Sequence, residues 1–80
     1  MSVKLVFLGK LADLAGAPER ELEAPLDWSS LVESLEGPLR AAVAGEKIKV
    51  AVNGAVLAER TTLIANNGDE VALLPPVSGG

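Results

Sequence analysis

The chain has 80 residues, room for a single domain, and its core must be aliphatic because Phe7 and Trp28 are its only aromatic residues. It contains no cysteine and no histidine, which excludes disulfides, thiolate metal sites, cysteine nucleophiles and imidazole acid–base catalysis. A net charge of −4 disfavours nucleic acid and anionic membrane as partners, since both attract basic surfaces. It favours a protein partner with a complementary basic surface.

The N-terminal segment resembles a signal peptide only superficially. Lys4 precedes a short apolar run at residues 5–8, but Lys10 and Asp13 interrupt the apolar stretch. No segment approaches the roughly 20 apolar residues of a membrane span. We therefore expect a cytoplasmic protein.

The first half of the chain predicts a strand, a short helix and a second strand. Residues 3–8 are apolar on both faces, which is typical of a central strand. Residues 10–15 carry apolar side chains at helical spacing and end at Gly16, a favourable C-terminal stop. Residues 19–24 alternate charged and apolar side chains, which indicates an edge strand with one face in water.

The middle of the chain predicts the main helix. Asp27 is a good N-cap residue, and the apolar periodicity continues to about residue 36. Gly37 and Pro38 end this helix, and residues 39–44 are predicted to form a short second helical turn, closed by the next glycine. Trp28, in the first turn, is interpreted as a packing residue.

A hairpin follows. Residues 48–52 form an apolar strand, and the pair Asn53 and Gly54 is the strongest short hairpin signal in the sequence. Residues 56–58 are the predicted return arm, which is short and lies at an edge.

The last predicted strand, residues 70–74, is as apolar as the first and follows a turn at residues 66–69. Two such strands most economically lie side by side, parallel, in the middle of one sheet, with the helix at residues 27–36 across one face. The sequence therefore predicts an α+β fold of the β-grasp, ubiquitin-like type, with a single mixed sheet of about five strands. Residues 1–74 would form this domain and residues 75–80 a flexible, extended tail.

The tail differs in kind from the domain. Its two prolines remove two backbone donors, so the preceding strand cannot continue, and they direct the chain away from the body. The chain then ends on two residues without side chains, so the terminal carboxylate could enter a channel too narrow for other residue types. The tail consists of Pro75, Pro76, Val77, Ser78, Gly79 and Gly80.

No catalytic constellation or metal site is predicted in the domain. Asp69 and Glu70 are neighbours in an extended segment and point to opposite faces, so they are not an acid–base pair. Glu19, Glu21 and Glu23 share one strand face, but three like charges are better read as a solvated surface than as a metal site. Any chemistry is expected at Gly80.

The position of Phe7 has two interpretations. It is either an ordinary core residue or, if it faces outward on the uncovered side of the sheet, part of a docking surface. The sequence pattern leaves both open.

Three stretches together resemble the small subunit of molybdopterin synthase, a family of ubiquitin-like sulfur carriers. They are FLGKLADLAG at residues 7–16, AVNG at residues 51–54 and NGDEVALLPPVSGG at residues 67–80. The chain departs from the family at Leu74, where an aromatic residue often precedes the two prolines.

The resemblance implies that an E1-like enzyme uses MgATP to adenylate the carboxylate of Gly80, and that a sulfur donor protein then displaces AMP to leave a thiocarboxylate. The tail, residues 75–80, would insert into the large subunit and deliver sulfur to cyclic pyranopterin monophosphate. Phe7 and Leu74 would meet that large subunit, in a heterotetramer of two small and two large subunits. No stably bound cofactor is expected, and the catalytic residues are expected on the large subunit.

Two other functions use the same terminal chemistry and stay open. A sulfur carrier of the thiamine pathway shares the fold and the Gly-Gly end, although such carriers are usually shorter. A ubiquitin-like modifier would instead join Gly80 to lysines through isopeptide bonds. A plain interaction module with an incidental tail is a further alternative.

Overall fold

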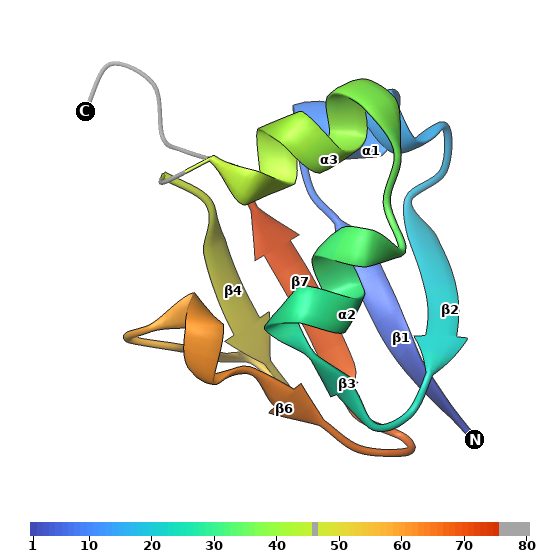
Figure 1. The fold of residues 1–80 in the computed structure, drawn as a ribbon, viewed down its shortest axis with the longest axis vertical. Coiled ribbons are helices and arrows are strands. Elements are labelled where there is room, and N and C mark those ends of the chain that lie inside the picture. The colour runs from blue at the N-terminus through green and yellow to red at the C-terminus, as the bar shows by residue number, and fades with distance from the viewer. Residues whose placement is uncertain (46, 76–80) are drawn as a thin grey trace.

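A five-stranded mixed sheet forms the centre of the protein (Figure 1). The computed structural model describes residues 1–45 and 47–75. The strand order is β2-β1-β7-β4-β5. The β1–β7 pair is parallel and the other neighbours are antiparallel. The strands are β1 (Ser2–Phe7), β2 (Glu19–Glu23), β4 (Lys49–Val52), β5 (Ala55–Val56) and β7 (Glu70–Leu74).

Three short helices form a layer on one face of this sheet, and Figure 1 shows α2 and α3 on the viewer's side of the strands. They are α1 (Lys10–Ala15), α2 (Trp28–Glu33) and α3 (Gly37–Ala44). A second, two-stranded antiparallel sheet joins β3 (Leu26–Asp27) to β6 (Ile64–Ala65), and a 3₁₀ turn, η1 (Arg60–Thr62), precedes β6. Within the described ranges no helix is long and apolar enough to cross a membrane.

This architecture confirms the β-grasp prediction, including the parallel pair of first and last strands at the sheet's centre. The pair forms because both segments are apolar enough to be buried, and a long connection with helices lets two strands run in the same direction. The edge position of β2 and the hairpin at Asn53 and Gly54 are confirmed as well; Asn53 has a positive φ of 50°.

The prediction of one main helix at residues 27–36 is wrong at its C-terminal end. Asp27 is the N-cap, as expected, and its carboxylate accepts a hydrogen bond from the Ser30 amide at 2.8 Å. However, α2 ends at Glu33, and α3 is the longer helix. Gly37 has a φ of +57°, which breaks the helical path, and Pro38 begins a new helix because proline is well accommodated in a first turn.

The core lies between the sheet and the helical layer. It takes every second residue of β1 and β7 and one stripe from each helix, as strand and helix periodicities require. Its fully buried aliphatic side chains include Leu5, Leu11, Leu31, Leu35, Leu63, Leu73, Val3, Val43, Val50 and Val71. No buried side-chain nitrogen or oxygen atom lacks a hydrogen-bond partner in the described part of the chain.

Two arginines satisfy the carbonyl groups at the ends of α2 and α3. Arg40 donates from Nε to the Leu35 carbonyl at 2.8 Å and from Nη2 to the Glu33 carbonyl at 2.9 Å. Arg60 donates to the carbonyls of Ala44 and Gly45, and its guanidinium lies 4.8 Å from the centre of the Trp28 ring. These contacts place positive charge at the C-terminal ends of α2 and α3 and join each helix to a neighbouring segment.

We expect Arg60→Ala to lower the free energy of unfolding by about 1–2 kcal/mol, because it removes charge-assisted hydrogen bonds and a cation–π contact. Arg60→Lys should recover less than half of that loss, since an ammonium group cannot make the same planar set of contacts. Urea unfolding followed by circular dichroism measures both, with the exposed Lys10→Ala as the control. Equal stability of the Arg60→Lys variant and the parent chain would contradict this role.

Hydrogen bonds join the β4–β5 hairpin to the turn before β7. The Asn53 amide group donates to the Asp69 carboxylate at 3.1 Å, and the Asn53 carbonyl oxygen Oδ1 accepts from the Glu70 amide at 2.9 Å. The Asp69 carboxylate also accepts from the Asn66 amide at 2.8 Å. The two turn signals in the sequence are therefore one structural unit that positions the start of β7.

We expect the protein to lose stability in acid because the carboxylates of Asp69 and Asp27 become protonated. The hydrogen bond from the Asn66 amide lowers the pKa of Asp69 below 3.8, and the bond from the Ser30 amide does the same for the pKa of Asp27. A lowered folded-state pKa stabilises the protein above the unfolded pKa of about 3.9, and this contribution is lost as the pH falls through the folded value.

The urea midpoint should therefore be level near neutral pH and fall below about pH 4. Asp69→Asn removes one titrating group and should give a shallower decline over the same acid range. A parallel decline in both proteins would show that Asp69 makes no contribution.

Candidate functional site

The edge of the sheet where β7 ends is the candidate functional site, because the tail begins there. The parallel register pairs Phe7 with Leu73, and the Leu8 amide extends the ladder by donating to the Leu73 carbonyl at 3.3 Å. The carboxyl ends of the two central strands thus lie at one edge. Pro75 is the last described residue, and the predicted tail positions 76–80, with Gly80 at their end, lie outside the described residues.

The structure corrects the expectation that Phe7 lies in a docking surface. Its side chain is 2% exposed and belongs to the core cluster. Strand alternation places Val3, Leu5 and Phe7 on the face that the helices cover. Phe7 is therefore a core residue, the other interpretation that the sequence left open.

Leu8, which the sequence analysis did not single out, is 39% exposed next to the buried Phe7. Alternation places it on the same side as Val6, away from the helices. The signal that could have found it is Lys4, because a lysine at the same parity as Val6 and Leu8 marks the side of β1 that faces water. Leu74, a predicted interface residue, is half-buried at the end of β7.

An apolar row crosses the open face of the sheet, which is the face opposite the helices. The register aligns Val6 with Ala72, Ala72 with Ala51, and Ala51 with Val56. We call these four residues the open-face row. Val56 is 60% exposed, Val6 and Ala72 are half-buried, and Ala51 is buried. The row and Leu74 lie on the same side of β7, because Ala72 and Leu74 are two positions apart.

Acidic residues border this row at the β2 edge. Glu19 is the register partner of Val6, and Glu21 is the partner of Lys4. Lys4 and Glu19 form an exposed ion pair at 3.8 Å, which contributes little to stability because water screens it. A face with an apolar centre and an acidic edge suits a protein partner that is apolar and basic.

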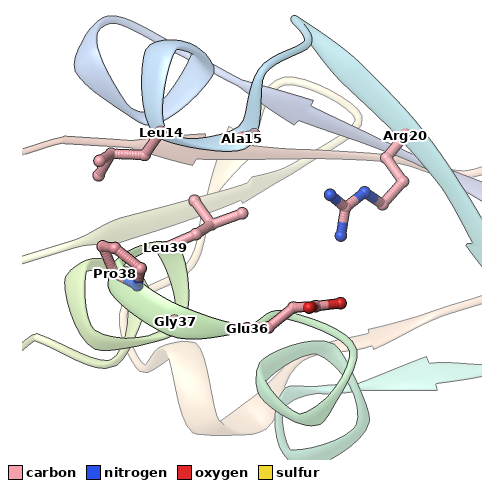
Figure 2. A pocket seen from close by; sticks show the side chains of 7 residues that line it. All are labelled: Leu14, Ala15, Arg20, Glu36, Gly37, Pro38 and Leu39. Carbon is pink, nitrogen blue, oxygen red and sulfur yellow. The ribbon is translucent and has the colours of Figure 1, made fainter.

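A shallow pocket of about 320 Å³ lies on the helical side, between α1, β2 and the start of α3 (Figure 2). Figure 2 shows the charged ends of Arg20 and Glu36 toward one end and apolar side chains at the other. The Arg20 guanidinium also lies 5.7 Å from the centre of the Phe7 ring. Arg20 therefore covers part of the core. The lining residues are Leu14, Ala15, Arg20, Glu36, Gly37, Pro38 and Leu39.

The described part of the chain contains no cluster of three or more aspartate or glutamate side chains that could hold a metal ion. Asp27 and Asp69 accept hydrogen bonds that lower their pKa, which suits a helix cap and a turn and is the opposite of what a general acid needs.

The sequence model of the ThiS family matches residues 5–80, nearly the whole chain. The protein belongs to the ThiS family. This assignment includes the tail as well as the β-grasp domain, and it makes the chain a ubiquitin-like protein of the sulfur-carrier type. A search among curated proteins found no match.

Solved structures with the same fold carry two kinds of description. SAMP1 from Haloferax volcanii is 26% identical with a TM-score of 0.75, and all of both chains is covered. The small archaeal modifier protein 1 (SAMP1) from Methanosarcina acetivorans is 25% identical with a TM-score of 0.80, covering 99% of this chain and 96% of that one. A putative molybdopterin converting factor, subunit 1, from Pyrococcus furiosus is 26% identical with a TM-score of 0.72, covering 96% and 99%.

Proposed function

We propose that this ThiS-family protein is a sulfur carrier for molybdenum cofactor biosynthesis and that Gly80 carries the sulfur as a C-terminal thiocarboxylate. The observation that carries the proposal is the place of β7, the strand that leads into the tail. It is a central strand, held by β1 on one side and β4 on the other. A tail that begins there starts from a strand paired on both sides, while the described residues contain no group of three or more acidic side chains that could hold a metal ion.

The proposed chemistry occurs at the C-terminal carboxylate. An E1-like enzyme joins the carboxylate of Gly80 to AMP and releases pyrophosphate from MgATP. Sulfide delivered by a sulfur donor protein then attacks the carbonyl carbon, so that a C–S bond replaces the C–O bond to AMP and leaves a thiocarboxylate. Activation is required because an oxygen of a free carboxylate is a poor leaving group. The absence of cysteine fits this role, since no thiol of the chain can intercept the acyl group.

The open face is the proposed docking surface for the molybdopterin synthase large subunit. Leu8 and Leu74 lie at the end of the sheet from which the tail leaves, and the open-face row extends from there across four strands. A partner that covers this surface would receive the tail residues 75–80 in its own active site, where its own residues would transfer sulfur to cyclic pyranopterin monophosphate. Two small and two large subunits would form the complete enzyme.

A second candidate function is protein modification, in which Gly80 forms an isopeptide bond with a lysine. The similarity to two SAMP1 structures supports it, at the same level of identity as the molybdopterin converting factor subunit. A thiamine-pathway carrier, the other role with this chemistry, is compatible with the family assignment. Both begin with the same adenylation.

The decisive experiment incubates thiocarboxylated protein with the large subunit and cyclic pyranopterin monophosphate and measures the dithiolene product. We expect product in proportion to the thiocarboxylate consumed. The control is the same protein with an ordinary carboxylate. No product, together with high-molecular-weight conjugates in cells that depend on Gly80, would replace the proposed function with protein modification.

A further inference from the structure

Gly9 lies where the first strand turns into α1, directly beside the root of the tail. The chain leaves β1 at Phe7, and the Leu8 amide makes the last ladder contact with Leu73. Gly9 then begins the turn, with a φ of 57° and a ψ of −135°. Because β1 and β7 are parallel and adjacent, this turn and Pro75 come together at one edge.

The contact between Gly9 and Pro75 is close. A Cβ atom added at Gly9 would lie 3.1 Å from Cγ of Pro75. This distance is shorter than ordinary van der Waals contact, so the proline ring would have to move by a few tenths of an ångström. The contact is specific to this position: Gly16, Gly54 and Gly68 also have positive φ values, and an added Cβ would meet nothing within 4 Å at any of them.

Pro75 is suited to transmit such a contact. Its ring fixes φ near −65°, so a push on the ring changes the direction of the backbone instead of being absorbed by rotation. Leu74, just before it, is held by pairing with Lys49. A shift of the ring therefore changes the direction in which the chain leaves Leu74.

We propose that Gly9 is a positioning residue for the C-terminal tail: its missing side chain lets Pro75 pack against the β1–α1 turn, and this packing sets the direction in which the chain leaves the sheet. The inference rests on the proposed function, because it matters only if the terminal carboxylate must reach an enzyme's active site. Gly9 touches no reacting atom. It acts through Pro75 by keeping the free protein in an arrangement ready for docking.

The test compares Gly9→Ala with Gly16→Ala. Both variants place a side chain at a positive φ, but only the alanine at position 9 meets Pro75. The assay is pyrophosphate exchange with MgATP and the purified E1-like adenylating enzyme of the same organism. It is run where urea unfolding shows each variant to be fully folded.

We expect Gly9→Ala to raise KM for the carrier about tenfold with kcat within about twofold, because misdirection affects docking and not the chemistry of a docked carboxylate. Gly16→Ala should match the parent chain. In the double variant Gly9→Ala, Pro75→Ala the added Cβ no longer meets a proline Cγ, so its KM should equal that of Pro75→Ala alone.

Equal KM values for Gly9→Ala and Gly16→Ala would overturn the positioning role, as would additive effects in the double variant. If Gly9→Ala does not fold, the Pro75→Ala variant is the test, because it keeps Gly9 and removes the contact. A KM for Pro75→Ala equal to that of the parent chain would overturn the proposal. Failure of the proposed function looks different: the thiocarboxylated parent chain would then give no dithiolene product with the large subunit, whatever the KM values in pyrophosphate exchange.

Discussion

Deleting Gly79 and Gly80 should abolish thiocarboxylate formation and leave the domain folded. The shortened chain still ends in a carboxylate, on Ser78, but that carboxylate is two residues short of the adenylating site. A misplaced reacting group loses the advantage of proximity. We therefore expect kcat/KM for adenylation of the carrier to fall at least about a hundredfold. The free energy of unfolding should stay within about 0.5 kcal/mol, because the described core ends at Leu73.

Pyrophosphate exchange and intact-protein mass spectrometry measure this loss, the second by the exchange of one oxygen for sulfur. A matched variant with two alanines in place of Gly79 and Gly80 keeps the length and the terminal carboxylate. It should also react poorly if the channel admits only residues without side chains. Normal thiocarboxylation of the shortened chain would contradict the assignment of the chemistry to Gly80.

The neighbouring residues Phe7 and Leu8 should respond in opposite ways to substitution. Phe7 is 2% exposed, so Phe7→Ala leaves a cavity in the core and should cost about 3–5 kcal/mol of stability. That is a large share of the roughly 4–12 kcal/mol expected for a domain of this size. Leu8 is 39% exposed, and Leu8→Asp should cost less than about 1 kcal/mol.

Leu8→Asp should instead weaken binding to the adenylating enzyme or the large subunit at least about tenfold, because it places a carboxylate in an apolar contact. Isothermal titration with each purified partner measures this. Ile64→Asp is the matched control, since Ile64 is 68% exposed but belongs to β6 in the second sheet. Unchanged affinity of the Leu8→Asp variant would place the docking surface elsewhere.

The central pairing of β1 and β7 could be predicted because it follows from local composition. Both segments are continuously apolar, and such strands are stable only where neighbours cover them. The hairpin at Asn53 and Gly54 could be predicted for a similar reason, since few residues tolerate a positive φ. Asp27 as an N-cap also needed only local chemistry, because its partner, Ser30, is three residues away.

The helical layer could be predicted only in part. The apolar stripe continues past Glu33, so its periodicity did not reveal that α2 ends there and α3 starts anew at Gly37. The Arg40 side chain, in the next helix, donates to the Glu33 and Leu35 carbonyls and thereby satisfies the free end of α2, a contact that periodicity does not show. The β3–β6 pair was missed because two-residue strands carry no periodic signal.

The sequence by itself determined the class of this protein: an aliphatic β-grasp domain without catalytic histidine or cysteine, ending in a tail whose terminal carboxylate is the expected reactive group. The tertiary structure showed that the helices cover the side of β1 opposite Lys4, so that Phe7 is buried and Leu8 is left at the surface; in the sequence, the parity of Lys4 alone pointed that way. Alternation along a strand shows that neighbours face opposite ways, but the layer packed on the sheet decides which way is inward. The contact of Gly9 with Pro75 has the same origin, since the parallel pairing brings together two residues that are 66 positions apart in the chain.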